Sequence, residues 1–151
     1  MKVIVQRVIE ASCTVDNKIT GKIDNGYMLL VGFNTNDNAS NVYEMVKKII
    51  NLRIMDDENH VMNKNILDTK GSILSISQFT LYADTKKGNR PSYINAMKGE
   101  DAIKLYALFN EELRKYLHVE EGVFGADMKI NLINDGPVTI ILEKWLWKYY
   151  V

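Results

Sequence analysis

The first third of the chain alternates short segments rich in β-branched residues with turn residues, a pattern typical of β-strands. Asp16-Asn17 is a turn signal between two such segments, which predicts a β-hairpin. The segment 27–33 is apolar at successive positions, which is typical of a strand buried on both faces. The strands predicted in this region are residues 2–8, 11–15, 18–23 and 27–33.

Two later segments have the period of amphipathic helices. From Ala39 onward, apolar residues recur at i, i+3, i+4, i+7 and i+8, and Asn38 or Ser40 can cap the first turn. These apolar positions are Val42, Met45, Val46, Ile49 and Ile50. A second helix is predicted after Gly99, where two acidic residues favour a helix N-terminus. Its predicted apolar stripe consists of Ile103, Tyr106, Ala107, Asn110, Leu113 and Leu117.

The other predicted strands lie between and after the helices. Residues 73–80 alternate with a period of two and predict a strand that runs into a basic loop at Lys86. Residues 128–133 and 138–142 predict two strands around a Gly-Pro turn.

This order of elements lacks the regular βαβ alternation of a parallel doubly wound sheet. We therefore expect a single α+β domain, in which mainly antiparallel β-sheets form a barrel-like core with two principal helices. The domain is expected to span residues 1–143, and a short aromatic tail follows at 144–151.

The charge balance limits the classes of partner. Lysine plus arginine and aspartate plus glutamate each number 19, so the formal net charge is zero. This balance argues against a strongly basic nucleic-acid surface, and we expect no binding to DNA. Lys86, Lys87 and Arg90 still form a local basic cluster, which is either solvated surface charge or a phosphate contact.

Cysteine usage and hydropathy indicate the compartment. Cys13 is the only cysteine, which excludes an internal disulfide and fits a reducing compartment. We expect its side chain in the core. Residues 1–7 lack the apolar region of a signal peptide, and no apolar run approaches the roughly 18 residues of a membrane span. We therefore expect a cytoplasmic protein with no membrane partner.

Several catalytic chemistries lack the residues that they need. Neither His60 nor His118 has a metal-ligand partner at i+2 or i+4, which argues against a zinc site. A Ser-His-Asp triad would have to recruit one of these two histidines through the fold. No glycine-rich loop with a lysine is present to hold nucleotide phosphates. We therefore expect no metal and no cofactor, and an enzyme with this sequence would depend on backbone groups and hydroxyls.

Two short segments are candidates for such chemistry. Backbone N–H groups near the end of the segment Ser77 to Leu81 can stabilise an oxyanion, as acyl transfer requires. Thr80 could also act as a nucleophile, although no base is adjacent in sequence. The alternative is an ordinary strand whose hydroxyls form local hydrogen bonds. Gly136-Pro137 is equally open to two interpretations, a rigid backbone that reads the shape of a substrate or a simple turn.

Four blocks occur in order along the chain and carry a family resemblance. They are Ser77 to Leu81, Lys87 to Ser92, Phe124 to Met128 and Asn134 to Thr139. Together with the opening Val5-Gln6-Arg7-Val8, they resemble the D-aminoacyl-tRNA deacylase family, also called D-tyrosyl-tRNA deacylase. The resemblance extends over nearly the whole chain and ends near Leu142, so that only the aromatic tail lies outside it.

The resemblance implies a homodimeric editing enzyme that acts on aminoacyl-tRNA. Such an enzyme hydrolyses the ester between a D-amino acid, or glycine, and the terminal adenosine, and it rejects L-aminoacyl-tRNA. In the family a cis Gly-Pro peptide of one subunit enters the pocket of the other, a role that falls to Gly136 and Pro137.

The resemblance also implies roles for individual residues of this chain. It assigns the pocket to Ser77, Gln78, Phe79 and Thr80, with the N–H groups of Phe79 and Thr80 as oxyanion donors. It places the ribose hydroxyl of the substrate in the reaction, which would explain the missing histidine base. The supporting residues are Arg7, Asn134 and Thr139, and the residues expected to contact tRNA are Lys86, Lys87 and Arg90.

Three alternatives remain open on the sequence. One is a general D-amino-acid esterase or peptidase that needs no RNA. Another is a module that binds charged tRNA without hydrolysing it. The third is a small α+β domain that only dimerises through its aromatic tail.

Overall fold

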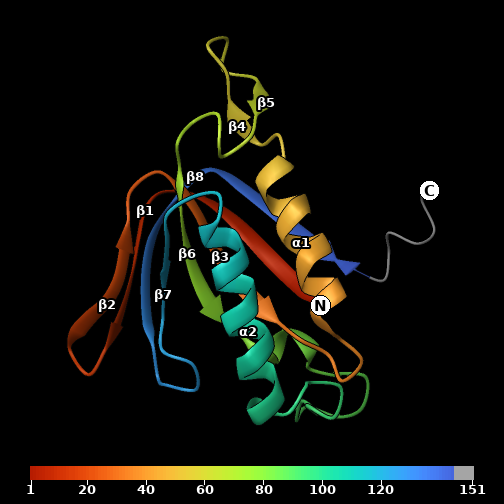
Figure 1. Ribbon diagram of the computed structural model, residues 1–151. Coiled ribbons are helices and arrows are strands. Elements are labelled where there is room, and N and C mark those ends of the chain that lie inside the picture. The colour runs from red at the N-terminus through yellow and green to blue at the C-terminus, as the bar shows by residue number, and fades with distance from the viewer. Residues whose placement is uncertain (145–151) are drawn as a thin grey trace.

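The computed structural model describes residues 1–144, and the predicted aromatic tail beyond Lys144 lies outside these described residues. The chain forms a six-stranded sheet, a two-stranded hairpin and two long helices (Figure 1). The sheet consists of β1 (Lys2–Val15), β2 (Lys18–Ile23), β3 (Gly26–Gly32), β6 (Ser72–Ser77), β7 (Val119–Glu121) and β8 (Lys129–Glu143). The predicted α+β class is confirmed.

The strand order is β2-β1-β3-β6-β7, with β8 paired to β1. The pairs β3/β6 and β6/β7 are parallel, and the three pairs that β1 makes are antiparallel. The sheet curves into a nearly closed barrel, so strands that are not neighbours meet inside it. For example, Ile23 of β2 packs in one cluster with Leu74 and Ile76 of β6.

The strand β1 is longer than predicted. Residues 2–8 and 11–15, expected as two strands, form one strand that pairs first with β3 and then with β2. The predicted turn at Asp16-Asn17 is confirmed, and both residues have positive φ values of 49° and 63°. A two-residue hairpin turn of type I′ requires positive φ at both of its central residues.

Two cores lie on opposite faces of the sheet. The barrel interior contains Cys13, Met28 and Leu74, whereas Tyr27 and Leu29 face the helices. Successive side chains of a strand point to opposite faces, so β3 contributes to both cores. The apolar run at 27–33 is therefore a strand buried on both faces, as predicted, and Cys13 lies in the core.

The helices α1 (Ala39–Asn51) and α2 (Gly99–Arg114) lie side by side against one face of the sheet (Figure 1). All five apolar positions predicted for α1 are buried, and Asn38 is the N-cap in a reciprocal capping box with Asn41.

The stripe predicted for α2 is partly wrong. Ile103 is 45% exposed and Ala107 is also exposed, whereas Ala102 and Phe109 are buried beside Tyr106. The sequence of α2 contains two overlapping apolar stripes, and packing against the sheet selected the one that includes Phe109.

Two predicted strand boundaries are also wrong. The strand predicted over 73–80 ends at Ser77 and continues as a one-turn 3₁₀ helix, η1 (Phe79–Tyr82). The segments 128–133 and 138–142 belong to one continuous edge strand, β8, because both pair with β1. The hairpin β4 (Met55–Asp56) and β5 (Met62–Lys64), which projects from the body in Figure 1, was not predicted.

Candidate active site

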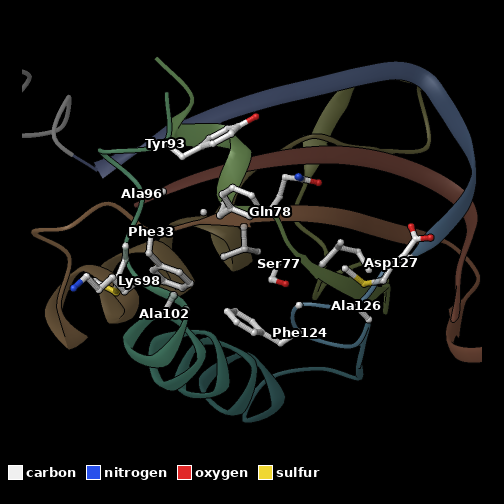
Figure 2. Close-up of a pocket in the computed structure, with 18 of the residues that line it drawn as sticks. Phe33, Ser77, Gln78, Tyr93, Ala96, Lys98, Ala102, Phe124, Ala126 and Asp127 are labelled. Atoms are coloured by element: carbon white, nitrogen blue, oxygen red, sulfur yellow. The ribbon is translucent and has the colours of Figure 1, made fainter. Parts of the chain in front are cut away.

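A cavity of about 670 Å³ opens where β6 ends. This volume is within the range of small-molecule sites. Its walls come from the end of β6 and η1, from the loop before α2 and from the loop before β8 (Figure 2). The residues that line it include Ser77, Gln78, Phe79, Tyr93, Phe124 and Met128. Three of the four predicted pocket residues are therefore brought together here.

The turn η1 begins where β6 leaves the sheet. The backbone N–H of Gln78 donates to the carbonyl oxygen of Val31 at 2.7 Å, the last link to β3. Gly32 lets the backbone at Gln78 lie close to β3, because a Cβ at position 32 would be 2.9 Å from the Gln78 carbonyl oxygen. A larger residue at this position would push η1 away from the strand.

The first residues of η1 present unused donors. At the start of a helix the first backbone N–H groups have no intrahelical acceptor. The N–H groups of Phe79 and Thr80 have no hydrogen-bond acceptor within residues 1–144. Thr80 itself is not among the lining residues, and its hydroxyl accepts a hydrogen bond from the Gln78 side-chain amide at 2.5 Å. The Thr80 hydroxyl is thus directed toward Gln78, which leaves the N–H groups of Phe79 and Thr80 without an acceptor among the described residues.

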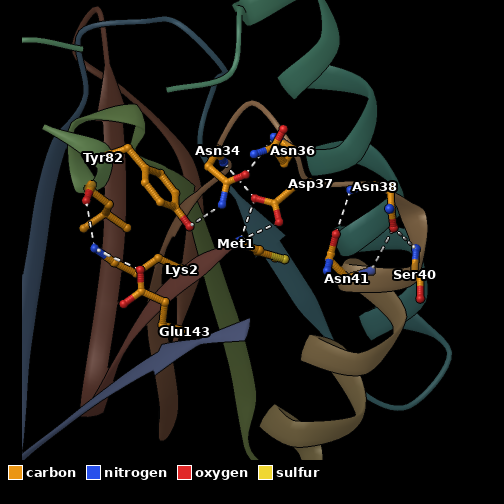
Figure 3. A network of polar contacts seen from close by, with 11 residues as sticks. Met1, Lys2, Asn34, Asn36, Asp37, Asn38, Ser40, Asn41, Tyr82 and Glu143 are labelled. Atoms are coloured by element: carbon orange, nitrogen blue, oxygen red, sulfur yellow. Dashed lines mark hydrogen bonds and ion pairs between the residues drawn. The ribbon is translucent and has the colours of Figure 1, made fainter. Parts of the chain in front are cut away.

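Polar contacts with the start of β1 hold η1, which contains no buried residue. The Lys2 ammonium donates to the carbonyl oxygen of Leu81 at 3.2 Å and lies 5.1 Å from the centre of the Tyr82 ring (Figure 3). The same ammonium forms an ion pair with Glu143 at 3.5 Å. A cation near the last carbonyls of a helical turn is favourable.

A second part of this network reaches the opposite wall of the cavity. The α-amino group of Met1 donates to Asp37 at 2.6 Å, and both groups are buried. Asp37 also accepts from the backbone N–H of Asn34 at 2.7 Å (Figure 3). Asn34 in turn forms a β-bridge with Ala96, which lines the cavity. The amino end of the chain therefore supports two walls of the cavity.

An aromatic residue supports the site from the helix side. The Tyr106 hydroxyl donates to the carbonyl oxygen of Ser75 at 2.8 Å, and the Tyr106 and Phe124 rings lie 5.8 Å apart. Burial raises the pKa of Tyr106 above its usual value of 10.0. The phenol therefore stays protonated and remains a hydrogen-bond donor near neutral pH.

The Gly-Pro segment lies outside the cavity of its own chain, in a bulge of β8. Gln6 pairs with Thr139 and Val8 with Asn134, so residues 135–138 bulge from β8 opposite Arg7 alone. The Gly136–Pro137 bond is cis, and Gly136 has a φ of 124°, a value that favours glycine. Neither residue is among those that line the cavity of the same chain.

Arg7 anchors this bulge. Its side chain is buried and donates to the carbonyl oxygens of Asp135 at 3.1 Å and of Ile54 at 2.8 Å. It also pairs with the carboxylate of Asp56 at 3.0 Å, which ties β4 to the bulge. These contacts are all within one chain.

The remaining predicted residues lie outside the cavity. Thr139 donates through its hydroxyl to Gln6, and Asn134 pairs with Val8 at the bulge. Lys86, Lys87 and Arg90 are exposed in the loop that follows η1.

Within residues 1–144, no cluster of three or more His, Cys, Asp or Glu side chains is arranged to hold a metal ion. Neither histidine of the chain lines the cavity. Over the same residues, no helix combines the length and the apolar character that a membrane crossing needs.

Sequence reasoning missed most of the cavity wall. Phe124 and Met128 belong to a block that carried the family resemblance, but nothing in the sequence assigned them to the site. Tyr93 and Met97 lie in a loop without periodicity, where no local signal identifies a lining residue.

Comparison with known proteins shows the family and the fold. The family model described as D-Tyr-tRNA(Tyr) deacylase matches residues 4–143. A solved structure described as c-Myc DNA Unwinding Element Binding Protein is similar at 41% identity and a TM-score of 0.90, over 95% of this chain and 98% of that chain. Another, described as a probable eukaryotic D-amino acid tRNA deacylase, has 16% identity and a TM-score of 0.81, over 93% and 97% of the two chains, and shares the fold. The chain therefore belongs to the D-Tyr-tRNA(Tyr) deacylase family, hydrolases that act on D-aminoacyl-tRNA.

Proposed function

We propose that this chain hydrolyses the ester of D-aminoacyl-tRNA in the cavity at the end of β6. The observation that supports this most strongly is the pair of unused N–H groups of Phe79 and Thr80 at the start of η1. Donors positioned where negative charge develops are the main requirement of acyl transfer, and the loss of one costs about 10² to 10³ in rate.

In the proposed reaction, water adds to the ester carbonyl carbon and the carbonyl oxygen becomes an oxyanion. The N–H groups of Phe79 and Thr80 stabilise this oxyanion. The tetrahedral intermediate then breaks the bond to the ribose oxygen, which takes up a proton and leaves with the tRNA. The neighbouring ribose hydroxyl assists proton transfer, and no histidine base is needed.

We propose that the active unit is a homodimer in which Gly136 and Pro137 complete the cavity of the partner. Two features support this. The two residues are not part of the cavity of their own chain, and β8 is an edge strand that pairs with β1 only, within the described residues. The exposed side chains of Ile133 and Ile141 on β8, and of Ile9 on the neighbouring strand β1, add apolar area. Edges of this kind are suited to isologous contacts.

The proposed selectivity follows from a rigid wall. Apolar fit is worth only about 1–3 kcal/mol per methylene group, so it cannot admit large and small D-residues while excluding every L-residue. Carbonyls of Gly136 and Pro137 that bind the α-amino group would direct an L side chain into backbone and a D side chain outward. Glycine has no side chain and would be accepted.

The basic loop after η1 is proposed to contact the acceptor end of the tRNA. Lys86, Lys87 and Arg90 are exposed there and follow the site turn directly. Few phosphate contacts on a protein of zero net charge would give weak binding with a shallow salt dependence.

A hydrolysis assay with D-Tyr-tRNA, L-Tyr-tRNA and Gly-tRNA tests this function. We expect the D-tyrosyl and glycyl substrates to be deacylated far faster than the L-tyrosyl substrate. Equal rates for the two tyrosine enantiomers would contradict the steric account. A D-tyrosyl ester without RNA is the control for a general esterase, and hydrolysis that does not increase when RNA is attached would favour that alternative.

A further inference from the structure

Tyr93 is an aromatic residue at the rim of the cavity for which the proposed reaction has no use. Its side chain lines the cavity and yet is 41% exposed. Figure 2 shows Tyr93 at the rim, on the side opposite Phe124. The exposed part of this ring, next to the cavity, is apolar surface that a bound ligand can cover.

The ring of Tyr93 is held in place by a second exposed aromatic residue. The rings of Phe79 and Tyr93 meet edge to face, with centroids 5.0 Å apart and planes at 70°. Phe79 is itself 57% exposed. An edge-to-face contact covers one face of one ring only. The pair is therefore oriented and still has ring surface available for stacking.

The loop just before Tyr93 is basic. Asp84 and Ser92 exchange both backbone hydrogen bonds, at 2.7 and 2.9 Å, and close the loop. The side chains of Lys86, Lys87 and Arg90 are exposed in it, and none of them has an ion-pair partner within residues 1–144. Unpaired cations beside an exposed aromatic ring are typical of sites for single-stranded nucleic acid, in which bases stack and phosphates are neutralised.

We propose that Tyr93 is a stacking platform for the base that precedes the terminal adenosine of the RNA. This inference rests on the proposed function, because the aminoacylated adenosine then occupies the cavity and the strand must leave over the rim. Tyr93 is at that rim, and the basic loop lies beyond it, where the next phosphates would pass. The charge of the loop favours RNA over a second copy of a chain with zero net charge.

The test is a comparison of RNA binding by matched variants. Two minihelix RNAs are used, one with a single-stranded 3′ end in CCA and one that ends blunt. We expect Tyr93→Ala to weaken binding of the RNA with the single-stranded end about 10-fold, because an unpaired base can stack on the Tyr93 ring. Binding of the blunt-ended RNA, which has no unpaired base at its end, is expected to stay unchanged. Tyr93→Phe keeps the ring and is expected to bind like the wild type. The control is Tyr43→Ala on α1, where a tyrosine is 50% exposed and does not line the cavity.

The outcomes decide the inference in both directions. Equal losses on the two RNAs, or no loss with the single-stranded end, would overturn it. Conversion of the protein to monomers by Tyr93→Ala, measured by sedimentation, would show that the ring covers a protomer contact instead. Hydrolysis of D-Tyr-tRNA by the wild type is measured separately. If the wild type does not hydrolyse D-Tyr-tRNA, the proposed function is wrong. The binding comparison then still tests whether Tyr93 stacks on RNA.

Discussion

The Lys2 ammonium donates to the carbonyl oxygen of Leu81 at 3.2 Å, which connects the first strand to the turn that carries the proposed oxyanion donors. The two residues are far apart in the sequence, and η1 has no buried residue of its own to fix its place. A turn that is not held by the core depends on such polar contacts for its position. Small displacements of the N–H donors lower the reaction rate, because stabilisation of an oxyanion depends on where its donors lie.

Lys2→Met is therefore expected to lower kcat for D-Tyr-tRNA by about 10-fold with a smaller effect on KM, since η1 shifts while the cavity stays open. Lys2→Arg keeps a cation in reach of Leu81 and should recover most of the rate. Steady-state kinetics checks both. The control is Lys115→Met, which removes a lysine paired with Glu112 at the far end of α2. A change in KM alone, or failure of the arginine variant to recover activity, would contradict a positioning role.

Thr80→Ala separates the backbone from the hydroxyl. Because the proposed donor is the N–H group, which the substitution keeps, we expect the rate of deacylation to fall by less than about 10-fold. The loss should reflect only the hydrogen bond that Gln78 makes to the Thr80 hydroxyl. Single-turnover kinetics measures it, with Thr85→Ala in the adjacent loop as the control. A loss of several orders of magnitude would identify the Thr80 hydroxyl as the nucleophile.

Arg7→Lys tests the anchor of the Gly-Pro bulge. A lysine ammonium cannot replace a buried guanidinium that reaches Asp135, Ile54 and Asp56 at once. The unpaired acceptors are expected to lower the free energy of unfolding by about 2 kcal/mol or more. Urea denaturation measures this, and the matched control is Arg114→Lys, whose partner Glu121 is at the surface. Equal effects of the two substitutions would mean that the buried contacts contribute little.

The α-amino group of Met1 should titrate below its usual range. Burial lowers its pKa from 8.0, and the hydrogen bond to Asp37 opposes this without cancelling it. Between the lowered pKa and 8.0 the unfolded chain binds a proton that the folded chain has lost, so this group makes the free energy of unfolding rise with pH in that window. NMR of protein labelled with ¹⁵N at Met1 checks the pKa, and Asp37→Asn should lower it further. A folded-state pKa at or above that of the urea-unfolded chain would contradict the prediction.

Local patterns predicted some elements well and others badly, for physical reasons. The period of α1 identified its buried face, because that helix has one apolar stripe. The helix α2 has two overlapping stripes, and only contact with the sheet chose between them. The end of β6 could not be predicted, because it depends on the hydrogen bond to Val31 and on the space beside Gly32.

The sequence by itself determined the fold class, the Asp16-Asn17 hairpin, the buried strand β3 and the family, because these depend on local periodicity, turn chemistry and ordered blocks of residues. Only the tertiary structure decided that the N–H groups of Phe79 and Thr80 have no acceptor among the described residues, that Tyr93 and Phe124 share a cavity with Ser77, and that the Gly-Pro segment is a bulge outside the cavity of its own chain. These features arise from pairing and packing between residues far apart in the sequence, and no local pattern records which partners meet.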